Sequence, residues 1–226
     1  ENLAAGVSEL AASSTALQEE IRQAQTLSLN AIYKQFVDNR VFVVFEWRDR
    51  TRNATLNRKS ALQTIILDTG AGLFAVFATA NTPLDSRDAR SVSASLQISG
   101  RSFAITEVGF LNGEPGIAAV QIPAAVVETS GLMPFTVAGE PLRFSNAVLV
   151  SADQEVYGEI PIRVPPGESG YLEIQSRLFN RLFGEFSPGT GDYVFSMTGE
   201  LTGIMVRSDR ARIMESPTFG DFRSLQ

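Results

Sequence analysis

The amino-acid sequence predicts an all-β protein, a sandwich or a barrel, with one α-helix at its N-terminus. From Asn39 onward, short runs of β-branched and aromatic residues recur between turns that contain Gly and Pro. No helical pattern of roughly 10–15 residues alternates with these runs, which argues against a parallel α/β sheet. The 15 Phe residues in a chain of 226 residues supply apolar volume for two β cores.

The N-terminal helix is expected over residues 1–36. Two interpretations of it follow: it self-associates weakly as a coiled-coil stalk, or it packs as an amphipathic helix on its own domain. One stripe of the helix forms a coiled-coil seam, whose residues alternate at spacings of four and three: Leu3, Val7, Leu10, Ser14, Leu17, Ile21, Ala24 and Ser28. Because the chain begins with Glu1 rather than Met, we expect it to be part of a longer protein in which this seam continues upstream.

A first β unit is expected over residues 37–124. A polar stretch at residues 48–53 is predicted to form a hairpin tip, and small residues dominate 124–131, which we interpret as the crossing to a second unit. The expected strands are Val41–Trp47, Ser60–Asp68, Leu73–Ala78, Ser91–Leu96, Phe103–Val108 and Ile117–Ile122.

Residues 125–226 are expected to hold this crossing, a second β unit and a C-terminal tail. Turns with Gly and Pro, such as those at 165–167 and 188–189, separate its short apolar runs. The expected strands are Leu142–Val150, Glu155–Val164, Tyr171–Ile174, Asp192–Met197 and Glu200–Val206.

The composition excludes most common catalytic chemistry. The sequence has no Cys and no His, which excludes disulfides, the usual zinc sites and every Ser-His or Cys-His nucleophile. We therefore expect no cofactor and no metal. With 19 basic and 25 acidic residues the net charge is −6, which argues against binding to nucleic acid. The apolar runs are far shorter than the ~18 residues that span a bilayer, so no membrane span is expected.

Four stretches, in order, resemble the trypsin-like (chymotrypsin-fold) serine proteases, particularly their bacterial HtrA-like branch. Residues 63–81 are similar to the strand–turn–strand that leads to the family's T-x-x-H segment, and residues 91–103 to the next hairpin. Residues 114–122 are similar to D-x-D-[LI]-A-[VL]-[LV]-x-[IV], and residues 189–204 to x-S-G-G-P-[VL]-[VF]-x-x-x-G-x-[VL]-x-G-[IV]. The resemblance implies two six-stranded antiparallel β-barrels, of the trypsin-like type, after the N-terminal helix.

Carried over position by position, the resemblance implies that the catalytic residues are lost. The His slot falls on Asn81, the Asp slot on Gly116, and the nucleophile slot on Thr190 or, after a shift of one residue, on its neighbour Gly191. Proline 188, which has no N–H, falls where the family takes one oxyanion donor. We expect Tyr193 to place a bulky side chain where a substrate backbone would approach.

The resemblance therefore implies an inactive protease homologue, a pseudoprotease, that binds a protein or peptide or acts as a structural module. The alternative is an active trypsin-like peptidase with an atypical site in which Thr190 is the nucleophile. A homo-oligomer formed through the N-terminal helix is a further expected assembly. The family resemblance also favours an extracytoplasmic or periplasmic location.

Overall fold

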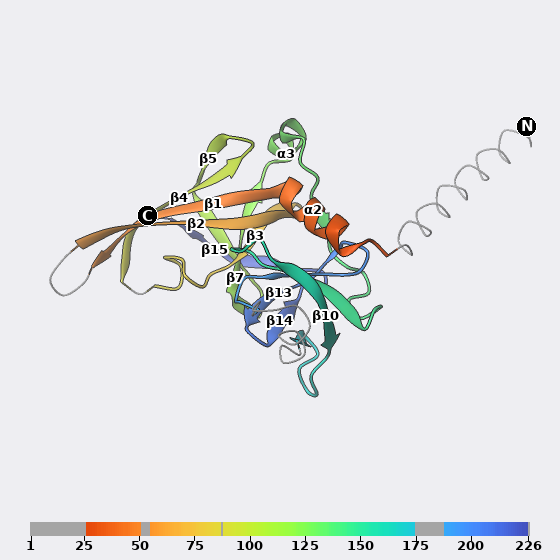
Figure 1. Ribbon diagram of the computed structural model, residues 1–226. Helices are drawn as coiled ribbons and strands as arrows, with labels where there is room; N and C mark the ends of the chain where they lie inside the picture. Colours follow the sequence, from red (N-terminus) through yellow and green to blue (C-terminus); the bar gives the residue numbers. More distant parts are fainter. Residues whose placement is uncertain (1–25, 51–54, 87, 175–187, 226) are drawn as a thin grey trace, which may run out of the picture.

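The computed structural model describes residues 26–50, 55–86, 88–174 and 188–225. Figure 1 shows two β bodies, an open sheet and a closed barrel, packed against each other with helix α2 (Leu29–Asn39) beside them. The predicted all-β fold with one helix before the strands is confirmed. Among the described residues, no helix is long and apolar enough to cross a membrane.

The first body is a nine-stranded sheet in the order β15-β6-β7-β3-β2-β1-β4-β5, with β8 paired to β2 off this path. All neighbours on the path pair in antiparallel fashion, and only β8 is parallel. The strands are β1 (Arg40–Arg50), β2 (Thr55–Asp68), β3 (Leu73–Ala78), β4 (Ala89–Ile98), β5 (Arg101–Ile105), β6 (Glu107–Leu111), β7 (Glu114–Ile122), β8 (Phe135–Thr136) and β15 (Phe219–Ser224).

The prediction of a closed six-stranded first barrel is wrong, because this sheet is only half closed. The ends of its path, β15 and β5, do not pair with each other among the described residues. Strand β5 ends at Ile105 and β6 begins at Glu107, so Thr106 connects them in the chain without a ladder between them. The predicted strand Phe103–Val108 is thus two strands with different partners, β4 and β7. The other edge of β6 pairs with β15, which takes the position of a closing strand.

The second body is the closed six-stranded antiparallel barrel that was predicted. Its strand order is β10-β11-β14-β13-β12-β9, and the last strand pairs again with the first. Residues at 0–2% exposure from every strand fill its interior or its contact with the sheet. The strands are β9 (Asn146–Val150), β10 (Tyr157–Arg163), β11 (Tyr171–Ile174), β12 (Tyr193–Phe195), β13 (Leu201–Arg207) and β14 (Arg210–Ile213).

Sequence patterns missed several short elements. The small-residue crossing contains helix α3 (Ala124–Ser130), which ends at Gly131 in the left-handed conformation. Strands β8, β14 and β15 were not predicted; β14 is short and rich in Arg, and most of β15 is exposed, so neither has a clear alternating pattern. Because β15 pairs with β6, the C-terminal residues lie in the first sheet.

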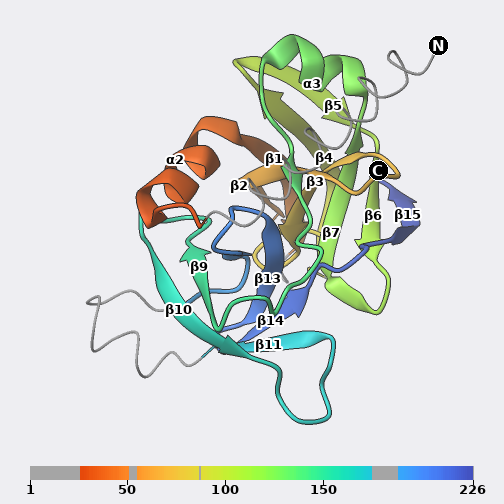
Figure 2. The same cartoon turned by 90° about the vertical axis from the view of Figure 1, so that its right-hand side faces the viewer.

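Helix α2 packs over one side of the junction between the two bodies (Figure 2). It begins after Ser28, whose hydroxyl accepts the N–H of Ala31 as an N-cap. Ile32 and Phe36, one turn apart, are 0% and 1% exposed in a cluster that includes residues from both bodies. Helix α2 therefore packs on its own domain. The prediction of one continuous helix over residues 1–36 is wrong, because residues 26–28 are not helical and α2 runs from Leu29 to Asn39 after the extended Ser28. The seam from Leu3 to Ala24 lies outside the described residues, so the coiled coil stays a prediction.

Candidate functional site

The junction between the two bodies contains a cavity of about 210 Å³. Asn81 lies in the loop after β3, and Thr190 lies in the loop before β12; both residues line the cavity. Gly116, on β7, does not line it, but its carbonyl accepts the N–H of Thr79 at 2.9 Å, just before Asn81. The fold therefore brings two of the three predicted slots to one cavity and the third next to it.

The His slot contains no base in either of two alignments. Asn81 has a left-handed backbone (φ 62°), which Asn tolerates better than most residues. Counted strictly from Thr79, the T-x-x-H spacing ends one residue later, at Thr82. The Thr82 hydroxyl is buried and donates to the Thr79 carbonyl at 2.6 Å, so it closes a turn. Neither an amide nor this hydroxyl can take a proton from an alcohol at neutral pH.

Three backbone N–H groups of the loop before β12, those of Gly189, Gly191 and Asp192, are committed within the protein. Gly189 N–H donates to the Asp192 carboxylate at 2.7 Å, and Asp192 N–H donates to the Gly189 carbonyl at 3.3 Å. Gly191 N–H donates to the carbonyl of Met205 at 2.8 Å, and Pro188 has no N–H. An oxyanion hole needs N–H groups that converge on empty space. These three donors instead close the loop and attach it to β13.

Asp192 holds this loop against the one that follows β9. Its side chain is 3% exposed, and its second carboxylate oxygen accepts the N–H of Ala152 at 3.0 Å. Burial raises the pKa of Asp192, while the N–H donors of Gly189 and Ala152 oppose that rise. From the sequence, which has Asp192 where the family carries Gly, a turn-stabilising role was favoured for this residue, and its bonds to the Gly189 and Ala152 N–H groups agree with that interpretation.

The expectation that Tyr193 blocks the substrate path is wrong. Its ring is 1% exposed and packs at the junction, with centroids 5.7 Å from Phe36 and 6.3 Å from Phe195. The hydroxyl crosses to the sheet and donates to the Val76 carbonyl at 2.9 Å. Burial is the main reason why the pKa of Tyr193 is raised, so the hydroxyl remains a neutral donor. Tyr193 therefore joins the two bodies beneath the cavity.

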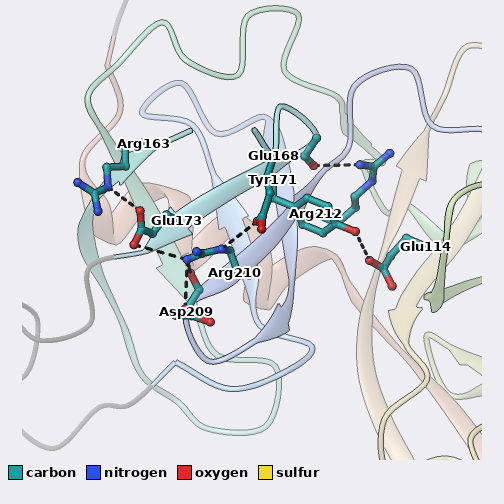
Figure 3. A network of polar contacts seen from close by, with 9 residues as sticks. Glu114, Arg163, Glu168, Tyr171, Glu173, Asp209, Arg210 and Arg212 are labelled. Carbon is teal, nitrogen blue, oxygen red and sulfur yellow. Dashed lines mark hydrogen bonds and ion pairs between the residues drawn. The ribbon is translucent and has the colours of Figure 1, made fainter. Parts of the chain in front are cut away.

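Beside the Asp slot lies a carboxylate that belongs to another residue. Glu114 accepts the Gly116 N–H with one oxygen, at 3.3 Å, and the Tyr171 hydroxyl with the other, at 2.7 Å (Figure 3). A Cβ added at Gly116 would lie 3.0 Å from that first oxygen. Because Glu114 is on β7 and Tyr171 on β11, this contact connects the two bodies. The sequence carried a signal for it: Glu114 falls on the first Asp of the family's D-x-D pattern.

The cavity walls are about equally polar and apolar, and the polar groups come from several loops. Among the residues that line it, Asp153 is the one carboxylate, and it accepts the Ser151 hydroxyl at 2.9 Å. The Thr190 hydroxyl donates to the Val206 carbonyl at 3.4 Å, a backbone group that cannot act as its base. In the described part of the chain, no three Asp or Glu side chains cluster as metal ligands would.

The comparisons with known proteins add little to this geometry. No family model and no curated protein matches the chain. Among solved structures, an HtrA-type protease with a decapeptide is similar at a TM-score of 0.47 and 11% identity, over 84% of this chain and 64% of that one. The chain thus spans 64% of the length of that structure. Because the TM-score is below 0.5, this likeness carries no argument about activity.

Proposed function

We propose that this chain is a non-catalytic trypsin-like domain that binds a protein or peptide at the junction of its two β bodies. The observation that carries the proposal is the state of the loop before β12, where Gly189, Gly191 and Asp192 use their N–H groups internally. Removing one oxyanion donor typically lowers the rate by about 10²–10³-fold. A site without a base, and with this loop closed on itself, has no route to acyl transfer.

The trypsin-like assignment is supported by where the resembling segments lie. They predict a site between two β bodies, and Asn81 and Thr190, distant in sequence, line one cavity there. The carbonyl of Gly116 accepts the N–H of Thr79, two residues before Asn81. The Glu114–Tyr171 contact supports the loss of catalysis, since the carboxylate near the Asp slot joins the bodies instead of orienting a base.

The binding role is supported by the shape and lining of the cavity. At about 210 Å³ it is large enough for one side chain of a partner, and its mixed walls offer both apolar contact and hydrogen bonds. Its lining residues are Phe42, Ala61, Leu62, Gln63, Phe77, Ala78, Ala80, Asn81, Ala152, Asp153, Thr190, Gly191 and Tyr193.

Peptide selection on the intact chain tests the binding role. Peptides from a random displayed library are selected, and their affinities are measured by fluorescence anisotropy for wild type, Ala80→Leu and Ala104→Leu. Ala80 lines the cavity, whereas Ala104 is an exposed residue of β5 and is the matched control. We expect Ala80→Leu to weaken binding by about tenfold or more and Ala104→Leu to leave it unchanged. Failure to select any peptide would favour a purely architectural module, and equal binding by both variants would show that the peptide does not bind in the cavity.

A further inference from the structure

The hairpin of β1 and β2 forms an arm with one unpaired edge. In Figure 1 the far ends of both strands extend away from the rest of the molecule. Strand β2 pairs with β1 from Thr55 to Ile65, but β3 begins to pair with β2 only at Ile65. Within the described residues, Thr55–Lys59 has no strand partner on the side away from β1, and its side chains are exposed. Every second residue of such a segment directs its N–H and C=O outward.

This edge is cationic, although the whole chain has a net charge of −6. Arg58 and Lys59 are consecutive, so their side chains lie on opposite faces of the strand. Each has one acidic neighbour on β1, Asp49 at 3.4 Å from Arg58 and Glu46 at 2.7 Å from Lys59. Both cationic side chains are solvent-exposed, with 54% of Arg58 and 65% of Lys59 accessible, so each can bind a second carboxylate.

A hollow of about 500 Å³ lies on the same arm, over strands β2, β1 and β4. Trp47, the one Trp of the sequence, contributes to its wall together with Arg48 and Lys59. The register places Lys59, Glu46 and Ser93 side by side across the three strands. A strand added to the edge of β2 would direct alternate side chains toward this hollow, beside a cation and an aromatic ring.

We propose that the β2 edge at Thr55–Lys59 binds an extended acidic peptide segment by strand addition. Main-chain hydrogen bonds supply the affinity, and carboxylates opposite Arg58 and Lys59 supply the selectivity. Charge favours an acidic segment over a second copy of this chain, because two such segments would place four cations and no carboxylate of their own in one short ladder. The site is separate from the junction cavity and does not depend on the role proposed there.

Titration with two synthetic peptides tests this proposal on the full chain. One peptide alternates Glu with Thr and Val, and the other has Lys in place of each Glu. We expect the acidic peptide alone to bind, and the exchange of the β2 backbone amides at residues 55–59 to slow when it does. Lys59→Glu should weaken binding by about fivefold or more, whereas Lys34→Glu should leave it unchanged. Lys34 is the matched control, since it is also exposed and also pairs with an acidic residue, Asp38.

Three outcomes would overturn the proposal. They are equal binding of both peptides, binding of the acidic peptide without protection of the β2 amides, and no binding at low ionic strength. If Lys59→Glu unfolds the chain, Lys59→Gln provides the same test with a smaller expected loss, and its folding is checked by circular dichroism.

Discussion

An acid placed at the proposed Asp slot, with Gly116→Asp, should destabilise the protein. Gly116 is not among the residues with positive φ, so its backbone accepts a side chain without strain. The new Cβ would lie 3.0 Å from a carboxylate oxygen of Glu114, and the new carboxylate would come close to that of Glu114. Glu114 would have to give up the Gly116 N–H or the Tyr171 hydroxyl.

The magnitude follows from the contacts that are lost. A hydrogen bond to a charged group contributes about 1.5–3 kcal/mol to stability. Tyr171 and Glu114 are only half-buried, and solvent reduces the contribution of such pairs, so we expect Gly116→Asp to lower the free energy of unfolding by about 1–2 kcal/mol. Gly116→Asn adds the same volume without the charge and should cost less. The assay is urea denaturation followed by the fluorescence of Trp47.

A double-mutant cycle separates this mechanism from simple crowding. In the Tyr171→Phe background the contact between the bodies is already broken, so Gly116→Asp should cost clearly less than it does in wild type. Equal costs in both backgrounds would refute the coupling between Gly116, Glu114 and Tyr171. A stability for Gly116→Asp within about 0.5 kcal/mol of wild type would refute the steric argument itself.

Three further predictions concern the junction and the helix. Phe36→Ala should lower the free energy of unfolding by about 3–5 kcal/mol, measured by urea denaturation, because it leaves a void among residues of both bodies; a cost below about 1 kcal/mol would show that α2 does not pack over the junction. Burial raises the pKa of Asp192 in the folded state. The stabilisation that its protonated side chain gives is therefore complete below the pKa of about 3.9 in the unfolded state, and it is lost as pH rises through the pKa of the folded state. As pH falls from about 7 to about 4, the melting temperature of wild type should therefore rise relative to that of Asp192→Asn in parallel melts. A difference in melting temperature that stays constant over this range would contradict this. Deleting residues 1–25 should leave the melting temperature nearly unchanged, since α2 and its cap remain; if the deleted seam is a coiled coil, sedimentation should show an oligomer before the deletion and a monomer after it.

Local patterns predicted the strands better than they predicted how the sheets close. Leu73–Ala78 and Tyr171–Ile174 have the bounds that the alternation of apolar and turn residues indicated, because each is short and ends at Gly, Pro or polar residues. Closure of the first sheet depends instead on the partner that the edge of β6 selects, and that partner, β15, is more than a hundred residues away. Nothing in the exposed pattern of β15 marks it as a strand of that sheet.

The candidate site shows the same division between local and distant information. The absence of His from the sequence already excluded the usual base, and the positions of Asn81 and Thr190 followed from the resemblance. The commitments of the loop N–H groups could not be foreseen, because Gly191 pairs with Met205 on another strand. The burial of Tyr193 was missed for the same reason, since its hydroxyl finds its acceptor on β3 of the other body.

The central claim, that the proposed non-catalytic domain does not catalyse hydrolysis, is tested most directly with a fluorophosphonate probe on the purified chain. Intact-mass analysis after incubation at neutral pH should show no adduct, and a parallel incubation with unfolded casein should show no cleavage. Thr190→Ala should behave identically to wild type in both assays. A covalent adduct on Thr190 that disappears in Thr190→Ala, together with casein cleavage that disappears with it, would contradict the account.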